Sequence, residues 1–176
     1  MTDTPRLLIT GSRAHRWTPY DSHALFLAVQ EIVEKTHAIP IVVHGDASGA
    51  DTHAAHAAIH LLGLQTEAHP ADWNTHGRAA GPIRNQEMIL MGADLCLAFP
   101  DHKKGQGSRG TWGCIDLAYQ ADIPVLIVWE RRLWVYDPDH KHQHPHGSYR
   151  VLDAYTRFAS QLTKGPSVSW QSTFTL

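Results

Sequence analysis

The chain has 176 residues, of which 43% are hydrophobic, and this combination fits one globular domain with a sizeable core. Its 15 Lys and Arg residues against 17 Asp and Glu residues give a formal net charge of −2, which argues against a general nucleic-acid binder. No apolar run approaches the roughly 20 residues that span a bilayer, and the N-terminal residues lack a secretory pattern. Cys96 and Cys114 form no CxxC pair and no disulfide framework. We therefore expect a soluble, cytoplasmic protein with no membrane partner.

Short apolar runs that end in turn signals alternate with helical patterns along the first 130 residues. The apolar runs are Leu7–Thr10, Ile39–His44, Thr66–His69, Leu95–Phe99 and Val125–Trp129, and the helical patterns are Ser22–Lys35, Ala50–Leu62, Ile83–Met91 and Thr111–Gln120. This alternation predicts an α/β fold: a single Rossmann-like, doubly wound domain with a mostly parallel five-stranded sheet flanked by helices. We expect Asp21 or Ser22 to cap the first helix and Gly63 to end the second.

The pattern weakens after Glu130, so residues 1–130 are predicted as the domain and residues 131–176 as a C-terminal extension packed on it. Asp137–Gly147 is polar and turn-rich, and Tyr149–Leu162 has helical spacing. Four alternating histidines resemble a metal-binding tract by residue type: His140, His142, His144 and His146. A built metal site draws its ligands from several rigid elements, so a solvated loop is the favoured interpretation. We assign no metal and no cofactor.

Three glycine-containing turns follow the first, second and fourth predicted strands: Gly11–Arg13, Gly45–Asp51 and Gly105–Thr111. In a doubly wound sheet these turns meet at the carboxyl ends of the strands, where the strand order reverses. A strand that leads through glycines into a helix directs bare backbone N–H groups at the helix start, which suits a phosphate. The predicted ligand-binding residues in these turns are Gly11, Ser12, Arg13, Gly45, Asp46, Ser48, Gly49, Gly107, Ser108, Arg109, Gly110 and Thr111.

Other residues near these turns have both a functional and a structural interpretation. Arg84 and Asn85 follow Gly81-Pro82, so they are expected in a first helical turn. Both are predicted to contact ligand, with a structural pairing of Arg84 with Asp72 or Asp94 as the alternative. Asp51 is expected to bind a ligand hydroxyl or to cap its helix.

Two further side chains are interpreted as packing residues. Trp73 could stack on a base, but tryptophan more often packs in a core, and we favour the core. Cys114 has apolar helical neighbours and is interpreted as buried filler rather than as a nucleophile.

Several motifs, in this order, resemble the SLOG superfamily of Rossmann-like nucleotide-binding proteins, which is named after the Smf/DprA and LOG proteins. They are TGSR at 10–13, HGDASGAD at 44–51, HPADW at 69–73, AGPIRN at 80–85 and GSRGT at 107–111 after a strand. The match covers roughly residues 6 to 129 and is nearest to the YspA-like branch. The resemblance implies a nucleotide or nucleotide-derived ligand and a homodimer or higher homo-oligomer.

The LOG-type enzymes of this superfamily cleave the N-glycosidic bond of nucleoside monophosphates. Gly107, Gly110 and Thr111 match their PGGxGTxxE motif, and Arg84 matches their helical Arg. Ser108 replaces the second glycine of the motif, and Cys114 stands where the catalytic Glu belongs. A carboxylate is expected near the anomeric carbon, so it must come from Asp46, Asp51, Glu87 or Asp116. The catalytic residues named for this chain are Arg84, Asp51 and Glu87.

Three functions remain open. The first is a nucleotide N-glycosidic hydrolase, that is, a phosphoribohydrolase-like enzyme. The second is a module that senses or sequesters a nucleotide signal without turnover, which needs the phosphate site but not the carboxylate. The third is single-stranded DNA handling of the DprA kind, which the near-neutral charge and the lack of an aromatic and basic surface pattern make the weakest.

Overall fold

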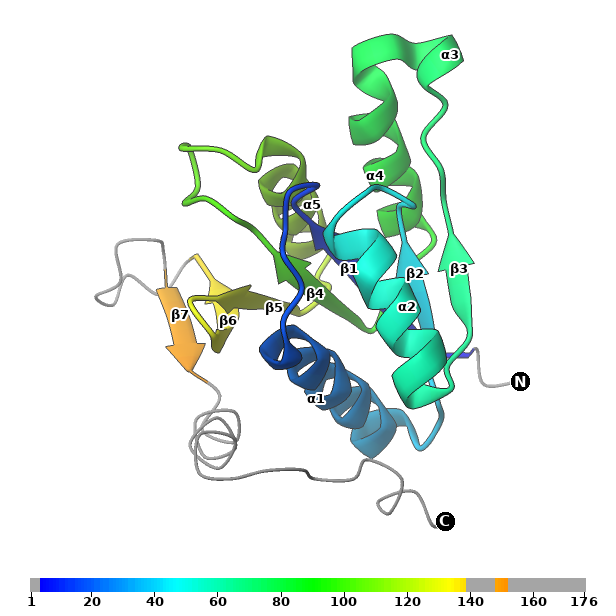
Figure 1. Ribbon diagram of the computed structural model, residues 1–176, viewed down its shortest axis with the longest axis vertical. Coiled ribbons are helices and arrows are strands. Elements are labelled where there is room, and N and C mark those ends of the chain that lie inside the picture. Colours follow the sequence, from blue (N-terminus) through cyan, green and yellow to red (C-terminus); the bar gives the residue numbers. More distant parts are fainter. Residues whose placement is uncertain (1–3, 139–147, 152–176) are drawn as a thin grey trace.

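The computed structural model describes residues 4–138 and 148–151 as an α/β structure (Figure 1). The strands are β1 (Arg6–Gly11), β2 (Ile41–His44), β3 (Thr66–Ala68), β4 (Leu95–Phe99), β5 (Val125–Trp129), β6 (Arg132–Asp137) and β7 (Ser148–Val151). The helices are α1 (Pro19–Thr36), α2 (Ala50–Leu62), α3 (Trp73–His76), α4 (Ala80–Leu90) and α5 (Arg109–Gln120), with a 3-10 turn, η1 (Gly77–Ala79), between α3 and α4. Within these residues, no helix has both the length and the apolar character needed to cross a membrane.

The strands form one sheet with the order β3-β2-β1-β4-β5-β6-β7. The five strands from β3 to β5 are parallel, and β6 and β7 continue the sheet in antiparallel pairing. The chain winds outward from the central β1 to β3, then returns to β4 on the other side of β1. This order confirms the predicted doubly wound, Rossmann-like fold and places the reversal between β1 and β4.

The sheet is longer than the predicted five strands because Arg132–Asp137 pairs with β5. Glu130 and Arg131 form the two-residue turn, and both have positive φ, 49° and 58°. Two successive residues with positive φ give a turn whose twist matches the flanking strands, but Asn-Gly is its usual sequence. Because Glu130-Arg131 is not a typical sequence for such a turn, the hairpin of β5 and β6 was not predicted. The prediction of a helix over Tyr149–Leu162 was also wrong at its start, since Ser148–Val151 forms strand β7. The rest of that segment, residues 152–162, and the four histidines at 140–146 lie outside the described residues.

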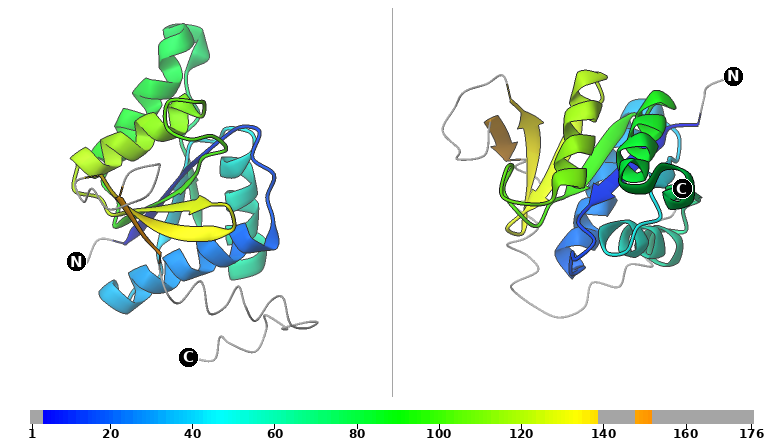
Figure 2. Two further views of the ribbon diagram at one scale, coloured as in Figure 1. Left: turned by 90° about the vertical axis from the view of Figure 1, so that its left-hand side faces the viewer. Right: turned by 90° about the horizontal axis from the view of Figure 1, so that it is seen from above.

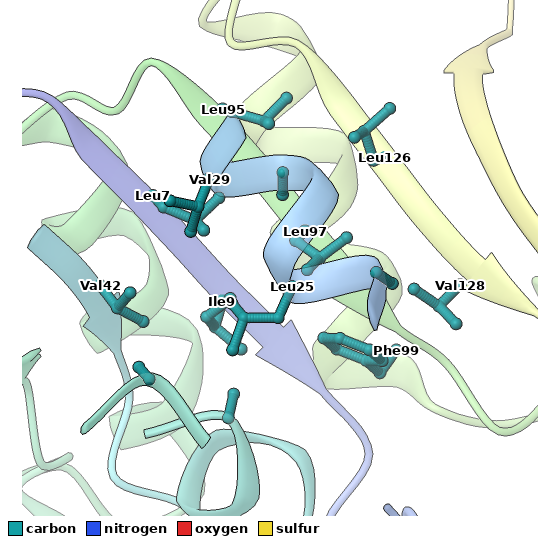
Figure 3. Packing of buried hydrophobic residues seen from close by; sticks show 14 of the residues in the cluster. Leu7, Ile9, Leu25, Val29, Val42, Leu95, Leu97, Phe99, Leu126 and Val128 are labelled. Atoms are coloured by element: carbon teal, nitrogen blue, oxygen red, sulfur yellow. The ribbon is translucent and has the colours of Figure 1, made fainter. Parts of the chain in front are cut away.

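Helices cover both faces of the parallel part of the sheet (Figure 2). One core packs α1 and α2 against alternate strand residues such as Leu7, Ile9 and Leu97, and Figure 3 shows this cluster. The other core packs α4 and α5 against the intervening residues, including Leu8 and Cys96. Because successive side chains point to opposite faces, strands covered on both sides need continuous apolar runs, as these strands have.

Local capping residues define the start of α1 and the end of α2. Thr18, not Asp21 or Ser22, precedes α1, and Asp21 in the first turn accepts a hydrogen bond from the Thr18 amide at 2.6 Å. This reciprocal arrangement is a capping box, in which the acidic residue sits three positions after the cap. Gly63 ends α2 in the left-handed conformation, as predicted.

Leu97→Ala should lower the free energy of unfolding by about 2–5 kcal/mol, because Leu97 lies fully buried on the central strand β4 and the substitution leaves a cavity. Leu61→Ala is the matched control, since Leu61 is 57% exposed on α2, and it should change stability by about 0.5 kcal/mol or less. Urea unfolding measures both. Equal losses in the two variants would contradict the assigned core.

Candidate functional site

The loops after β1 and β4, the first turn of α2 and the start of α4 enclose a cavity of about 270 Å³, here called the central cavity. It lies at the carboxyl edge of the sheet, where the strand order reverses, as the sequence predicted. The predicted site residues that line it are Gly11, Ser12, Arg13, Asp51, Arg84, Asn85, Ser108, Arg109, Gly110 and Thr111.

A second hollow of about 290 Å³, here called the side cavity, adjoins the central one. The β2–α2 loop contributes Gly45, Asp46 and Ser48 to it, and the segment after β3 contributes Pro70 and Ala71. The two cavities share four lining residues, which are Arg13, Ala47, Trp73 and Arg84. They are therefore two parts of one cleft.

Three predicted site residues do not line either cavity. Glu87 lies on the exposed face of α4, and Gly107 packs against the His102 ring. Gly49 precedes α2 with φ 81°, and a Cβ there would lie 2.4 Å from the Ser12 carbonyl oxygen. Gly49 is thus needed for the close approach of two loops rather than for ligand contact.

Arg84 is 8% exposed and binds two main-chain carbonyls across the cleft. Its Nη1 donates to the carbonyl oxygens of Gly45 and His69, the latter at 3.1 Å. Its Nε donates to Asn85 Oδ1 at 3.0 Å, and Asn85 Nδ2 donates to the Gly110 carbonyl at 3.3 Å. Among the described residues, none accepts a hydrogen bond from Nη2. Burial lowers the pKa of Arg84, against the opposing effect of the nearby Asp51.

Neither structural partner expected for Arg84 contacts it. Asp72 caps α3 by accepting from the Thr75 amide at 3.0 Å, and Asp94 accepts from the Arg6 amide at 2.7 Å. Helix α4 also begins at Ala80, three residues before the expected Ile83, because α3 and η1 lead into it. Arg84 therefore lies in the second turn rather than the first. Gly45 must lack a side chain, since a Cβ there would lie 1.5 Å from Arg84 Nη1.

Asp51 is the acidic group of the central cavity and is 4% exposed. It follows the first residue of α2, so it is not the cap; its Oδ2 accepts from the amides of Gly45 at 3.0 Å and Ala47 at 3.4 Å. Within the described residues, Oδ1 accepts no hydrogen bond. Burial raises the pKa of Asp51 to about 6, and the charge of Arg84 and the two amides only partly oppose this. The carboxyl therefore changes its charge close to neutral pH.

Trp73 does not lie in the core, which corrects the favoured sequence interpretation. Its side chain is 47% exposed, lines both cavities, and stacks with Arg13, whose Cζ lies 5.0 Å from the ring centroid. The reason is that α3 is a single short turn beyond the end of β3, outside the helix layers (Figure 1). Such a cation–π pair places an aromatic face at the entrance of the cleft.

Cys114 is fully buried, as expected, and lies outside both cavity linings. Burial raises the pKa of its thiol to about 11, although a hydrogen bond with Thr10 and the charge of Arg84 act in the other direction. A thiol in this state is neutral at physiological pH and makes a poor base. The geometry agrees with the interpretation of Cys114 as a packing residue.

His15 was missed by sequence reasoning, because its partners Asp21 and Asp101 come from other elements. Its Nδ1 lies 2.9 Å from Asp101 Oδ1, and its Nε2 lies 3.4 Å from Asp21 Oδ1. Burial alone would lower the pKa of His15, but these two carboxylates raise it overall. The Asp101 amide donates to Ser108 Oγ at 3.1 Å, so this cluster fixes the loop that leads into α5.

Lys104 also ties the loop before α5 to the domain, because its Nζ donates to Asp116 Oδ1 at 2.6 Å. Asp116 therefore takes part in an ion pair and is outside the cavity linings. Of the four carboxylates considered from sequence, only Asp51 and Asp46 line the cleft, in its central and side cavities respectively.

Asp51→Asn should make the protein more stable at neutral pH but not in acid. The pKa of Asp51 rises from its ordinary 3.8 to about 6 on folding, so the folded state binds more protons between these values. The free energy of unfolding therefore falls as pH rises from about 4 to 6. The amide oxygen of the variant side chain still accepts from Gly45 and Ala47, and the amide does not ionise. We expect equal stability at pH 4 and a gain of roughly 2–3 kcal/mol at pH 7.5, measured by urea unfolding; a pH-independent difference would contradict the raised pKa.

Comparison with known proteins identifies a phage relative. No protein-family model matches the chain. The chain is 40% identical over 130 residues to the Gene 61 protein of Mycobacterium phage D29, an alignment that covers 69% of this chain and 94% of that protein. The chain belongs to the family of this phage Gene 61 protein.

Proposed function

We propose that the cleft binds a nucleotide and that the chain is a phosphoribohydrolase-like member of the SLOG superfamily that cleaves the N-glycosidic bond. One observation carries this proposal. A buried carboxyl with a raised pKa, Asp51, shares the central cavity with the buried Arg84 and with the start of α5. Anion-binding groups and a proton-donating acid in one cavity are what such a reaction needs.

The start of α5 offers a site for the phosphate. Residues Arg109, Gly110 and Thr111 form its first turn, where backbone N–H groups lack partners within the helix. All three line the central cavity, together with Arg13 and Ser108. The helix dipole and two arginine side chains add positive potential. This set of groups suits a phosphate monoester.

Asp51 is the acid in the proposed reaction. Cleavage replaces the bond from C1′ to the base nitrogen by a bond to a water oxygen, through a state with positive charge on the sugar. Protonated Asp51 donates its proton to the departing base, and the resulting carboxylate stabilises the positive charge and accepts a proton from water. A pKa of about 6 keeps both forms of the carboxyl populated near neutral pH. Asp51 on α2 would thus take the role of the catalytic Glu of LOG-type enzymes, whose position on α5 is occupied here by Cys114.

The second candidate is a nucleotide sensor or sequestering module. It is favoured by the burial of Cys114 at the position that carries the catalytic Glu in LOG-type enzymes. In that case Asp51 only binds a sugar hydroxyl, and no base is released. Single-stranded DNA handling remains the weakest alternative because of the formal net charge of −2. The proposal includes a cytoplasmic location, which is inferred from the cysteine usage. It also includes self-association, which is inferred from the resemblance to the SLOG superfamily.

A panel of nucleoside monophosphates, scored for thermal shift and for released base, tests the function. A ligand at about 100 times its Kd should stabilise the protein by roughly 2.7 kcal/mol. Asp51→Asn should lower base release by about 10²–10⁴-fold and keep the thermal shift, because only the proton donor is lost. Asp122→Asn, an exposed carboxylate remote from the cleft, is the control. Binding without base release by the native chain would favour the sensor, and no thermal shift with any nucleotide would refute the site.

Cys114→Ser should leave base release nearly unchanged, because the thiol is buried and holds a pKa of about 11. The same assay of released base measures this, with melting curves to check folding. A loss of release in a variant that still binds nucleotide would make the thiol a catalytic group and would overturn the role given to Asp51.

A further inference from the structure

His15 lies between two carboxylates that come from different elements. Its Nδ1 is 2.9 Å from Asp101 Oδ1 in the β4–α5 loop, and its Nε2 is 3.4 Å from Asp21 Oδ1 in the first turn of α1. The ring also packs against Trp17 and Phe99, with centroid distances of 6.2 Å and 5.4 Å. A neutral imidazole has one N–H, so it can direct a donor at one of the two carboxylates, whereas the imidazolium directs a donor at each. The protonated form therefore fits this position better.

The two carboxylates beside His15 are fixed by further contacts. Asp21 is 4% exposed, and its Oδ2 accepts from the Thr18 amide at 2.6 Å and from the Thr18 hydroxyl at 2.7 Å. Its Oδ1 is the oxygen that faces His15. The Asp101 amide donates to Ser108 Oγ at 3.1 Å, which holds Asp101 at the start of its loop. Because a buried carboxylate is costly without a compensating charge, loss of the His15 proton weakens the whole cluster.

His15 can exchange its proton because it lines a hollow of about 300 Å³, here called the outer cavity. The outer cavity shares no lining residue with the central or the side cavity. The other charged or titratable groups in its lining, besides Asp21 and Asp101, are Arg16, Tyr20, Glu130 and Arg131. Within the described residues, none of these four forms an ion pair with His15. Burial lowers the pKa of His15, but Asp21 and Asp101 raise it above its ordinary 6.5.

His15 is connected to two serines in the lining of the central cavity. Its amide donates to the Ser12 carbonyl at 3.2 Å, and Ser12 follows β1. Its other connection runs through Asp101 to the hydroxyl of Ser108, which precedes α5 with a left-handed backbone, φ 48°. Ser12 and Ser108 both line the central cavity, in the loops beside the proposed phosphate. The contact of His15 with Asp101 therefore joins these two loops.

We propose that His15 is a positioning residue for the phosphate site: as an imidazolium it holds together the loops that carry Ser12 and Ser108, and loss of its proton weakens anion binding. This inference rests on the proposed function and adds its regulation by pH. His15 lines neither cavity of the cleft, so it acts through Asp101 and not on the ligand itself. Its contribution is present below the pKa of His15 and is lost as the pH rises through that pKa.

Sulfate is the probe for the test, because it is a tetrahedral anion that keeps its double negative charge while histidine titrates. The parent protein carries Asp51→Asn, since the Asp51 carboxyl in the central cavity would itself ionise near pH 6. The Kd of sulfate is measured from about pH 6 to about pH 9 at constant ionic strength, for the parent and with His15→Gln or Asp101→Asn added. Asp122→Asn is the matched control for Asp101→Asn, because Asp122 is exposed and lines none of the three cavities.

The parent should bind sulfate roughly three- to tenfold more tightly at about pH 6 than at about pH 9. The midpoint should lie above 6.5. His15→Gln should bind sulfate weakly at every pH and lose most of this dependence, because glutamine does not ionise. Asp101→Asn should move the midpoint to lower pH, because one of the two groups that raise the pKa of His15 is lost. The NMR titration of the His15 ring should shift in the same direction, and Asp122→Asn should match the parent in both measurements.

A His15→Gln variant that keeps the pH profile of the parent would overturn the inference, even with a lower affinity throughout, because uniform weakening indicates a structural role alone. An unchanged midpoint in Asp101→Asn would also overturn it, and this variant decides the question if His15→Gln does not fold. Both results leave the phosphate site standing, because sulfate still binds. If the parent binds no sulfate at any pH, the proposed function fails and the inference fails with it.

Discussion

The contact of Arg84 with the Gly45 and His69 carbonyls is the interaction on which the rest of the cleft depends. It joins α4 to the ends of β2 and β3, and Asn85 extends the connection to the start of α5 through Gly110. A guanidinium suits this role because its donors form a rigid, planar fork. Without it, the two cavities would lose the wall that they share.

Burial of this cation has a consequence for Asp51. A buried charge is costly unless another group compensates it, and Arg84 lowers the pKa of Asp51 while burial raises it. Because burial is the larger effect, the carboxyl stays close to half protonated near pH 6 instead of forming a permanent ion pair. Arg84 is satisfied mainly by neutral carbonyls, and this leaves Asp51 free to exchange a proton. A direct ion pair with Arg84 would instead favour the charged form of the Asp51 carboxyl and hinder its protonation.

The sequence predicted the doubly wound topology of the parallel strands and most residues of the central cavity, because strand-turn-helix signals are local and this topology brings their loops together. It failed where the determining contact was distant or lacked a sequence signal. The Glu130-Arg131 hairpin has none of the usual turn residues. His15 is defined by two carboxylates from other elements. Trp73 was assigned to the core on the general preference of its residue type, whereas its position on a one-turn helix decides its exposure.

Two of the helices that start at the carboxyl edge, α2 and α5, offer places for a carboxylate near Arg84. On α5, Cys114 belongs to a buried cluster with Ile115 and Ala118, so an ionised group there would displace apolar packing. On α2, the first turn is bordered by loop amides, and two of them already bond the Asp51 carboxylate. A carboxylate is therefore less costly to hold on α2 than on α5. The presence of Cys114 at the α5 position is compatible with the proposed acid-dependent reaction, because Asp51 on α2, which lines the central cavity, can supply the acid.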